Sequence, residues 1–192
     1  MKGFGEKHKN PKKKKSNSDE QTIKDQIISR AFKEHSQGNI QEAKKYYENF
    51  INKGFLDHRV FSNYGMILIN LGELQKAEIF TRQAIEINPN FAMAYSNLGI
   101  IFQNLGELQK AEIFTRQAIE IDPNFAMAYF NLGNIFQNLG ELQKAEIFTL
   151  KAIEIDPNYA MAYFNLGNIR KDLGKRKDSL DSYLRVIEIN PQ

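Results

Sequence analysis

Apolar residues recur at helical spacing along the chain, and the first such set lies on one face of a predicted helix: Ile23, Ile27 and Ala31. The preceding residues Ser18–Gln21 have the capping-box pattern that starts a helix, and Gly38 ends it. A second helix is predicted over residues 40–53, closed by Gly54. The first expected element is therefore a pair of helices joined by a short turn.

The same helix-turn-helix pattern recurs with a period of about 34 residues. Residues 92–125 and 126–159 are nearly identical, and they differ only at these pairs: Ser96/Phe130, Ile100/Asn134, Arg116/Leu150, Gln117/Lys151 and Phe125/Tyr159. The frame extends in both directions and predicts five units: residues 24–57, 58–91, 92–125, 126–159 and 160–192. No single hairpin can cover its own apolar face, so we expect the units to stack.

The repeated residues resemble the tetratricopeptide repeat (TPR) family, whose pattern is carried in one unit by Tyr95, Leu98, Gly99, Phe102, Ala111, Ala118 and Pro123. The resemblance implies an all-α fold, a right-handed superhelical solenoid of stacked antiparallel helical hairpins over residues 18–192. One departure is regular, because the family usually places an aromatic residue where this chain has Thr81, Thr115 and Thr149. A phenylalanine stands one place earlier in each unit, which we interpret as a rotated core contact.

An asparagine or aspartate followed by proline separates successive hairpins, at Asn88-Pro89, Asp122-Pro123 and Asp156-Pro157. Both residue types are typical of helix starts, since the first caps free backbone amides and proline at the first helical position loses no hydrogen bond. We therefore expect each pair to begin the next helix.

Composition limits the chemistry of the chain. The absence of cysteine excludes disulfides and thiolate chemistry, and no apolar run approaches the roughly 20 residues needed to span a bilayer. The charged start is followed by more charge and not by the apolar core of a secretory signal. These features predict a cytoplasmic protein.

Basic charge is concentrated at the start of the chain, where residues 1–17 are predicted to form a disordered arm. The array that follows is close to neutral. The lysine run Lys12, Lys13, Lys14 and Lys15 would give weak contact with nucleic acid or an anionic membrane. A solvated arm that only aids solubility is the alternative.

Candidate catalytic groups are few. His8, His35 and His58 have no spacing that places two of them on one helical face, so no metal site is predicted. No glycine-rich phosphate-binding motif occurs, and the glutamates that recur in every unit fit a solvated outer face. We therefore expect neither an enzyme nor a cofactor.

The resemblance instead places function on the concave groove that the first helix of each hairpin lines. Amide side chains recur there, with a ladder of Asn63, Asn97, Asn131 and Asn165 and, beside it, Asn134, Asn168, Gln103 and Gln137. A carboxamide can donate to and accept from a peptide backbone, and this ladder resembles the one lining the repeat groove of the O-linked N-acetylglucosamine transferases. The alternative is that the amides bond neighbouring backbone and stiffen the array.

Two aromatic residues, Phe130 and Phe164, occupy adjoining inner positions together with Met93, Met127 and Met161. They are either core residues or apolar anchors for a ligand. The lysines and arginine with which some family members hold a terminal carboxylate are replaced here by methionine, serine and phenylalanine. An extended peptide or amphipathic helix with apolar side chains is therefore the expected ligand.

These features predict a non-catalytic scaffold that binds a peptide or helix of a partner protein in its groove. One alternative is that the repeats are the substrate-recognition segment of a larger glycosyl-, sulfo- or methyltransferase. Another is that the lysine arm tethers a polyanion and the repeats are a spacer. Exchange of the similar hairpins between chains would give a homo-oligomer.

The final predicted helix carries apolar residues that no following helix covers: Leu180, Leu184, Ile187 and Ile189. Either a partner surface covers that end, or this sequence is part of something longer.

Overall fold

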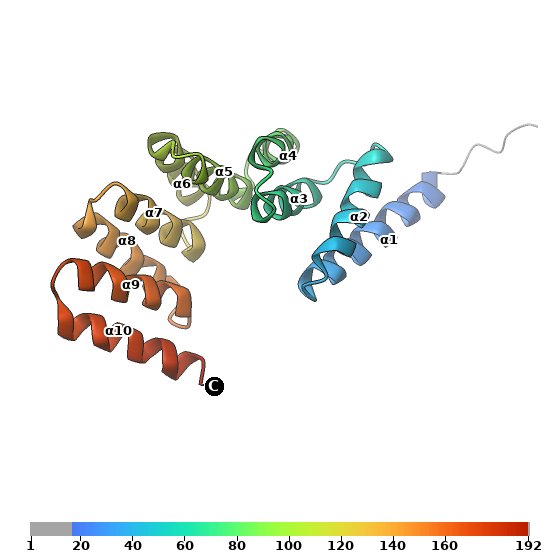
Figure 1. The fold of residues 1–192 in the computed structure, drawn as a ribbon. Coiled ribbons are helices and arrows are strands. Elements are labelled where there is room, and N and C mark those ends of the chain that lie inside the picture. The colour runs from blue at the N-terminus through green and yellow to red at the C-terminus, as the bar shows by residue number, and fades with distance from the viewer. Residues whose placement is uncertain (1–16, 192) are drawn as a thin grey trace, which may run out of the picture. The chain divides into compact units, whose positions relative to one another are not determined.

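The computed structural model describes residues 17–191, which form ten α-helices and no strand (Figure 1). They divide into two compact units between Phe55 and Leu56, and each unit is described by itself. The predicted basic arm, with Lys12–Lys15, lies outside the described residues except for Asn17, where the first helix already begins. The prediction of an all-α fold is confirmed.

The first unit is one hairpin of α1 (Asn17–Ser36) and α2 (Ile40–Asn52). Its core contains Tyr47, whose hydroxyl oxygen lies 3.0 Å from Nδ1 of His35. Burial lowers the pKa of His35, so its ring is neutral at pH 7. That this hairpin continues the array of the second unit stays a prediction of the sequence.

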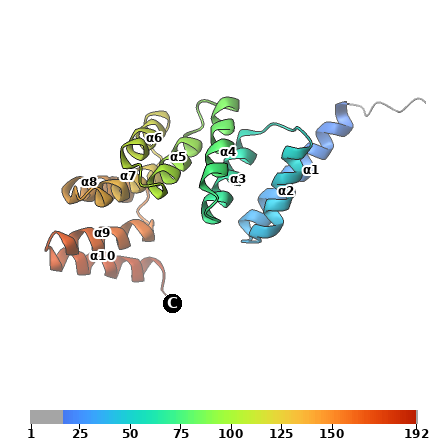
Figure 2. The ribbon, with the colours of Figure 1, turned by 45° about the horizontal axis from the view of Figure 1, so that its top comes forward.

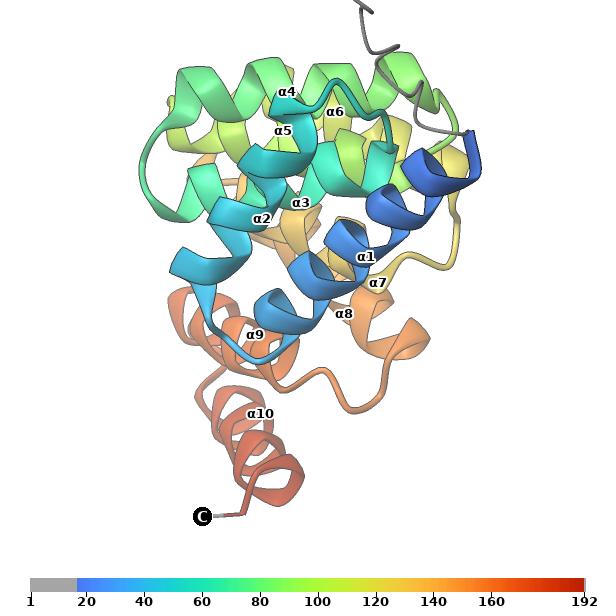
Figure 3. The same cartoon turned by 90° about the vertical axis from the view of Figure 1, so that its right-hand side faces the viewer.

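The second unit is a solenoid of four hairpins, and the views in Figures 1, 2 and 3 agree on their order. The hairpins are formed by α3 (His58–Asn70) and α4 (Leu74–Ile87), α5 (Ala92–Asn104) and α6 (Leu108–Ile121), α7 (Ala126–Asn138) and α8 (Leu142–Ile155), and α9 (Ala160–Asp172) and α10 (Arg176–Ile189). Each tight turn inside a hairpin uses a glycine, as at Gly106 with φ of 77°. An L side chain rarely adopts this left-handed conformation, which explains glycine at this place.

The stacking of the hairpins defines an inner and an outer side. The first helices α3, α5, α7 and α9 contact one another in succession, and each second helix contacts the first helix that follows it. No two second helices of this unit make comparable contact. The first helices therefore lie on the shorter, inner side, as predicted for the groove.

Within the middle hairpins the two helices approach closely through glycine and threonine. Gly99 on α5 faces Thr115 on α6, and Gly133 on α7 faces Thr149 on α8; a methyl group at either glycine would overlap the threonine hydroxyl. Both threonines are fully buried. The threonines that depart from the family pattern therefore lie where the two helices of a hairpin come close together.

The displaced phenylalanines form a second contact layer. The rings of Phe102 and Phe114 stack with centroids 5.2 Å apart, and those of Phe136 and Phe148 repeat the arrangement at 5.3 Å. The guanidinium of Arg116 lies 5.5 Å from the Phe148 ring, so a cation of one hairpin covers the aromatic pair of the next. The aromatic side chains therefore join neighbouring hairpins as well as the two helices of one hairpin.

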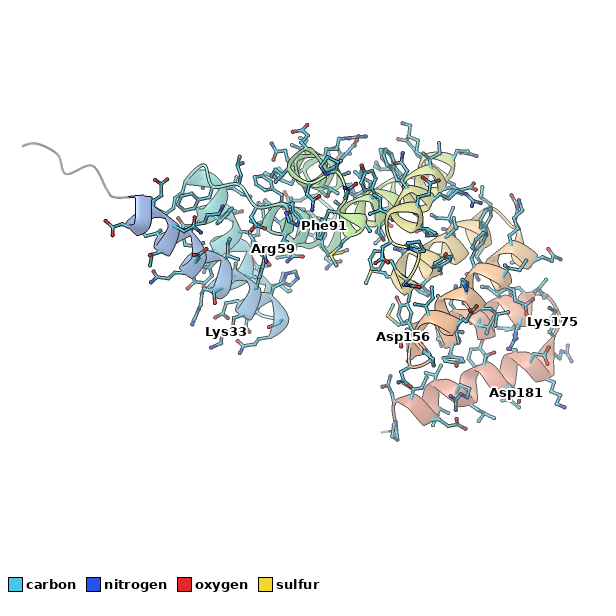
Figure 4. The ribbon with its side chains drawn as sticks, turned by 180° about the vertical axis from the view of Figure 1, so that it is seen from behind. Lys33, Arg59, Phe91, Asp156, Lys175 and Asp181 are labelled. Carbon is cyan, nitrogen blue, oxygen red and sulfur yellow. The ribbon has the colours of Figure 1, made fainter. Side chains whose placement is uncertain are left out.

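The last junction replaces this layer with an ionic one. Arg170 stands where Phe102 and Phe136 stand in earlier hairpins, and its Nε donates to Glu146 Oε1 at 3.0 Å. Lys175, labelled in Figure 4, donates to the other Glu146 oxygen at 2.5 Å. In the preceding hairpin the matching Glu112 pairs with Arg116 of its own helix, and that arginine is Leu150 in α8. Glu146 is therefore available to the next hairpin.

The predicted helix starts at the proline pairs are wrong. Asn88, Asp122 and Asp156 follow the last residue of a second helix, and the next helices begin at Ala92, Ala126 and Ala160. Each side chain instead accepts a hydrogen bond from the backbone amide two residues later; for Asp156, labelled in Figure 4, this amide is that of Asn158, at 3.1 Å. Proline here fixes a turn between hairpins, since its ring also suits the position after a helix end.

Gly99→Ala should lower the free energy of unfolding by about 1–3 kcal/mol, because the new methyl group overpacks the contact with Thr115. The direction of the change is informative, because replacing glycine by alanine in an uncrowded helix stabilises the helix by roughly 0.5–1 kcal/mol. Urea denaturation followed by circular dichroism measures the change. Adding Thr115→Ala should recover part of the loss. A Gly99→Ala variant as stable as the parent would contradict the close contact.

Glu146→Gln should destabilise the protein at pH 7 by about 1–3 kcal/mol, because Arg170 and Lys175 lose a charged partner. Burial raises the pKa of the Glu146 carboxyl, but the hydrogen bonds and charges of Lys175 and Arg170 outweigh burial and hold the pKa below its ordinary value. The stabilisation is therefore complete above the unfolded-state pKa and is lost as the pH falls through the lower folded-state pKa.

Denaturation of Glu146→Gln and parent protein between pH 7 and pH 3 should show the difference closing at the acid end. Glu112→Gln is the matched control, since its pair with Arg116 is more exposed and lies within one helix. It should cost only about 0.5 kcal/mol. Equal losses for the two variants would argue against an ionic junction.

Candidate functional site

Two members of the predicted amide ladder are buried where first helices meet. The exposed fraction is 1% for Asn97 and 6% for Asn131. Asn97 Nδ2 donates to Ser62 Oγ at 3.0 Å and to the Ser62 carbonyl at 3.2 Å, and Asn131 Nδ2 donates to Ser96 Oγ at 3.0 Å. A peptide in the groove would have to displace these hydrogen bonds to reach either amide.

The pattern changes at Asn165 because its serine is missing. Phe130 stands where Ser62 and Ser96 stand in earlier hairpins, and Asn165 Nδ2 donates instead to Asn134 Oδ1 at 2.6 Å. Asn134 is itself a replacement, since Ile100 occupies that place one hairpin earlier. Two of the five differences between the near-identical repeats therefore act on the same inner contact.

Four of the predicted residues come together in one pocket on the inner side of the last hairpin: Phe130, Phe164, Asn165 and Asn168. The pocket has a volume of about 370 Å³, and its other lining residues are Ala160, Met161, Val186 and Asn190. Phe164 is 54% exposed and Met161 is 62% exposed, which is unusual for large apolar side chains. These two side chains are open to the groove and are not core residues.

Helix α10 contributes to this pocket, which the sequence analysis did not foresee. Tyr183 takes the place of the buried threonine of earlier hairpins and packs against Gly167. Its hydroxyl donates to Asn168 Oδ1 at 2.8 Å, and its ring lies 5.8 Å from that of Phe164. The sequence could have indicated this contribution, because Tyr183 replaces Thr149 one period later. Tyr183 does not line the pocket itself, but it contacts two residues that do, Asn168 and Phe164.

The pocket carries no charged side chain among its lining residues. Tyr159 lies beside it, with its ring 5.2 Å from that of Phe130. Burial, and then the charge of Asp156, raise the pKa of Tyr159, so its phenol is neutral at pH 7. The pocket therefore offers apolar surface and neutral hydrogen-bonding groups, and its chemistry suits an uncharged ligand group.

The remaining predicted residues are not gathered there. Three of them are half-buried and do not line the pocket: Asn63 on α3, Gln103 on α5 and Gln137 on α7. Whether they bind a peptide stays a prediction. Val186 and Asn190 were missed, because the sequence analysis assigned the groove to first helices alone.

Two searches of the described residues gave negative results. Among residues 17–191 no cluster of three or more histidine, aspartate or glutamate side chains is placed to hold a metal ion. In the same part of the chain no helix combines the length and apolar character needed to cross a membrane.

Comparison with known proteins gives family matches along the second unit. Tetratricopeptide repeat models match residues 58–91, 92–125, 126–159 and 148–179. No relative was found among the curated proteins.

Solved structures share the fold at low sequence identity. TTC0263, a thermophilic TPR protein in Thermus thermophilus, has a TM-score of 0.79 and 17% identity, with 88% of this chain and 92% of that chain covered. MamA 41-end from Desulfovibrio magneticus RS-1 has a TM-score of 0.67 and 21% identity, with 86% and 94% covered. YrrB, a TPR protein with an unusual peptide-binding site, has a TM-score of 0.59 and 20% identity, with 91% of each chain covered.

At these identities the structures bear on the fold alone, whereas the repeat models rest on the sequence itself. The matched residues extend over 58–179, well over half of the 192 residues. The matches over 58–91, 92–125 and 126–159 each contain one hairpin, whereas the match over 148–179 runs from α8 through α9 to the start of α10. The chain therefore belongs to the tetratricopeptide repeat family.

Proposed function

We propose that this chain is a non-catalytic interaction scaffold that binds a segment of a partner protein along its inner side. The pocket formed by Phe130, Met161 and Phe164 takes one large apolar side chain of that segment. A cytoplasmic partner fits the predicted localisation. YrrB, which shares the fold, supports the general idea that such an array carries a peptide-binding site.

One observation carries the proposal. The position that is serine in the first two hairpins of the second unit is phenylalanine in the last two, as Phe130 and Phe164. Ser62 and Ser96 are buried and hydrogen-bonded to the next hairpin, so they close the inner side. Phe164 at the matching position is largely exposed and borders the pocket. An exposed aromatic ring beside a pocket is a typical anchor site in protein interfaces.

The neutral lining indicates the class of ligand. Burial of one phenylalanine-sized or leucine-sized side chain contributes about 1.5–3 kcal/mol, and the pocket volume of about 370 Å³ accommodates such a group. Asn165 and Asn190 lie in the lining and can bond the ligand backbone beside the anchor. A charged terminal carboxylate has no cationic partner in this lining, so an internal apolar segment is favoured.

Selection of a random dodecapeptide library on the immobilised protein tests the proposal. We expect enrichment of peptides with an aromatic or long aliphatic residue. Titration of one enriched, fluorescein-labelled peptide should then show at least about tenfold weaker binding to Phe164→Ala, because the anchor loses its main contact. Phe130→Ala should weaken binding similarly.

Ile147→Ala is the matched control, because Ile147 is an equally exposed large apolar residue on a second helix and does not line the pocket. It should bind the peptide like the parent protein, and all variants should retain the parent helical content. A library that enriches nothing, or an enriched peptide that binds Phe164→Ala and parent protein equally, would rule out this pocket as the binding site.

A further inference from the structure

A second pocket lies at one end of the α5–α6 hairpin, where α5 begins and α6 ends. Its volume is about 280 Å³, and its apolar lining consists of Phe91, Ala92, Met93, Ile121 and Phe125. The ring of Phe91, labelled in Figure 4, packs against the ring of His58 with centroids 4.6 Å apart. Asp122 is the charged residue of the lining, and we call this site the Asp122 pocket.

The Asp122 pocket occupies the same place in its hairpin as the pocket described above in the last hairpin. Met93 lies two periods before Met161, and each methionine lines its own pocket. The two linings differ in charge at one matching position, where Asp122 corresponds to Asn190. The unit therefore has an apolar pocket at two equivalent places, one with an amide in its lining and one with a carboxylate.

The Asp122 carboxylate is available to a ligand. The residue is exposed, and its Oδ1 accepts a hydrogen bond from the backbone amide of Asn124 at 3.0 Å. Within residues 17–191 no cation pairs with it. Its second oxygen, Oδ2, can therefore accept from a positively charged group at the edge of the pocket.

The charge around this pocket is unbalanced. Two acidic residues of the hairpin have cationic partners on the same helix or beside its start: Glu107 pairs with Lys110 and Glu112 with Arg116. The other two, Glu120 and Asp122, are exposed at the end of α6, and neither forms an ion pair with another described residue. The carbonyl end of α6 adds partial negative charge at the same place. The edge of the pocket therefore attracts a cation.

We propose that the Asp122 pocket binds a segment of a partner protein in which an aromatic or long aliphatic residue stands near lysine or arginine. The apolar side chain occupies the pocket, and the cation pairs with Asp122 and Glu120. Side chains two residues apart lie on the same side of an extended segment, so the cation stands two residues before or after the apolar residue. This site goes beyond the proposed function, because it does not depend on binding in the pocket of the last hairpin.

Nuclear magnetic resonance of protein with ¹³C-labelled methionine methyl groups observes the two pockets separately, because Met93 lines one and Met161 the other. The probe is a glycine- and serine-based peptide with one phenylalanine and a lysine two residues away on each side. It should shift the Met93 signal, identified by its loss in Met93→Leu, until the shift saturates. The signal of Met127, which lines neither pocket, is the control and should not move. A probe with alanine in place of phenylalanine should bind at least about tenfold more weakly.

Charge variants test the role of the carboxylate. Replacing both lysines of the probe by glutamate should weaken the Met93 response at least about tenfold, because repulsion replaces attraction. Asp122→Asn should weaken binding of the lysine probe about threefold. It keeps the acceptor for the turn, as Asn88 does with the amide of Asn90 at 3.1 Å. Asp156→Asn is the matched control, since Asp156 makes the same turn one period later and does not line this pocket, and it should bind like the parent.

Three results would overturn the proposal: a Met93 signal that stays in place at millimolar probe, equal responses to the lysine and glutamate probes, or equal affinity of Asp122→Asn and parent protein. A response of Met161 alone would also refute this second site while supporting the proposed function. A charge-dependent response of Met93 without one of Met161 would support this site and count against the pocket of the last hairpin. The two proposals therefore fail separately.

Discussion

The close approach of the two helices in each middle hairpin determines much of the surrounding structure. Gly99 and Gly133 face buried threonines, and a methyl group at either glycine would overlap the threonine hydroxyl. With threonine at this place, the aromatic residue stands one position earlier, at Phe114 and Phe148, where it stacks on a first-helix phenylalanine. This displacement carries the ring to the edge of the hairpin, where an arginine of the preceding hairpin covers it. A steric condition inside one hairpin thus sets the chemistry of the junction between two.

In the last hairpin the aromatic residue is not displaced, and this changes both the pocket and the junction with the preceding hairpin. Tyr183 occupies the threonine place, so the aromatic ring returns to the helix–helix contact and reaches Asn168 and Phe164 on the inner side. The position that earlier hairpins give to phenylalanine becomes Ser182, which accepts a hydrogen bond from Arg170 Nη1 at 3.0 Å. Arg170 then holds Glu146 across the junction. The change to Ser182 and Tyr183 therefore supports the pocket and adds one hydrogen bond to Arg170 at the ionic junction.

The fold was predictable because the repeat gives the same information several times. Helix positions, the turn glycines and the inner location of the first helices followed from periodicity and from the family resemblance. The helix starts at the proline pairs were wrong, since asparagine and aspartate favour turns as strongly as helix caps, and composition alone does not separate the two. Phe130, Phe164, Asn165 and Asn168 were among the residues predicted for the groove, and they line one pocket. That they bind a ligand stays a prediction. The burial of Asn97 and Asn131 and the contribution of α10 depend on which side chains meet across hairpins, and spacing along one helix does not reveal this.

A stacked array allows substitutions at one unit to act locally, because each hairpin contacts only its neighbours. The two near-identical repeats illustrate this, since Ser96/Phe130 and Ile100/Asn134 alter the inner side while Arg116/Leu150 alters the junction. The shared remainder of the repeat keeps the helices in place, so the altered residues change surface chemistry without changing the backbone. The inner side is consequently closed by serine–asparagine contacts in the early hairpins and opens into an apolar pocket in the last one. Binding specificity in this chain is therefore expected to reside in the few positions at which its repeats differ.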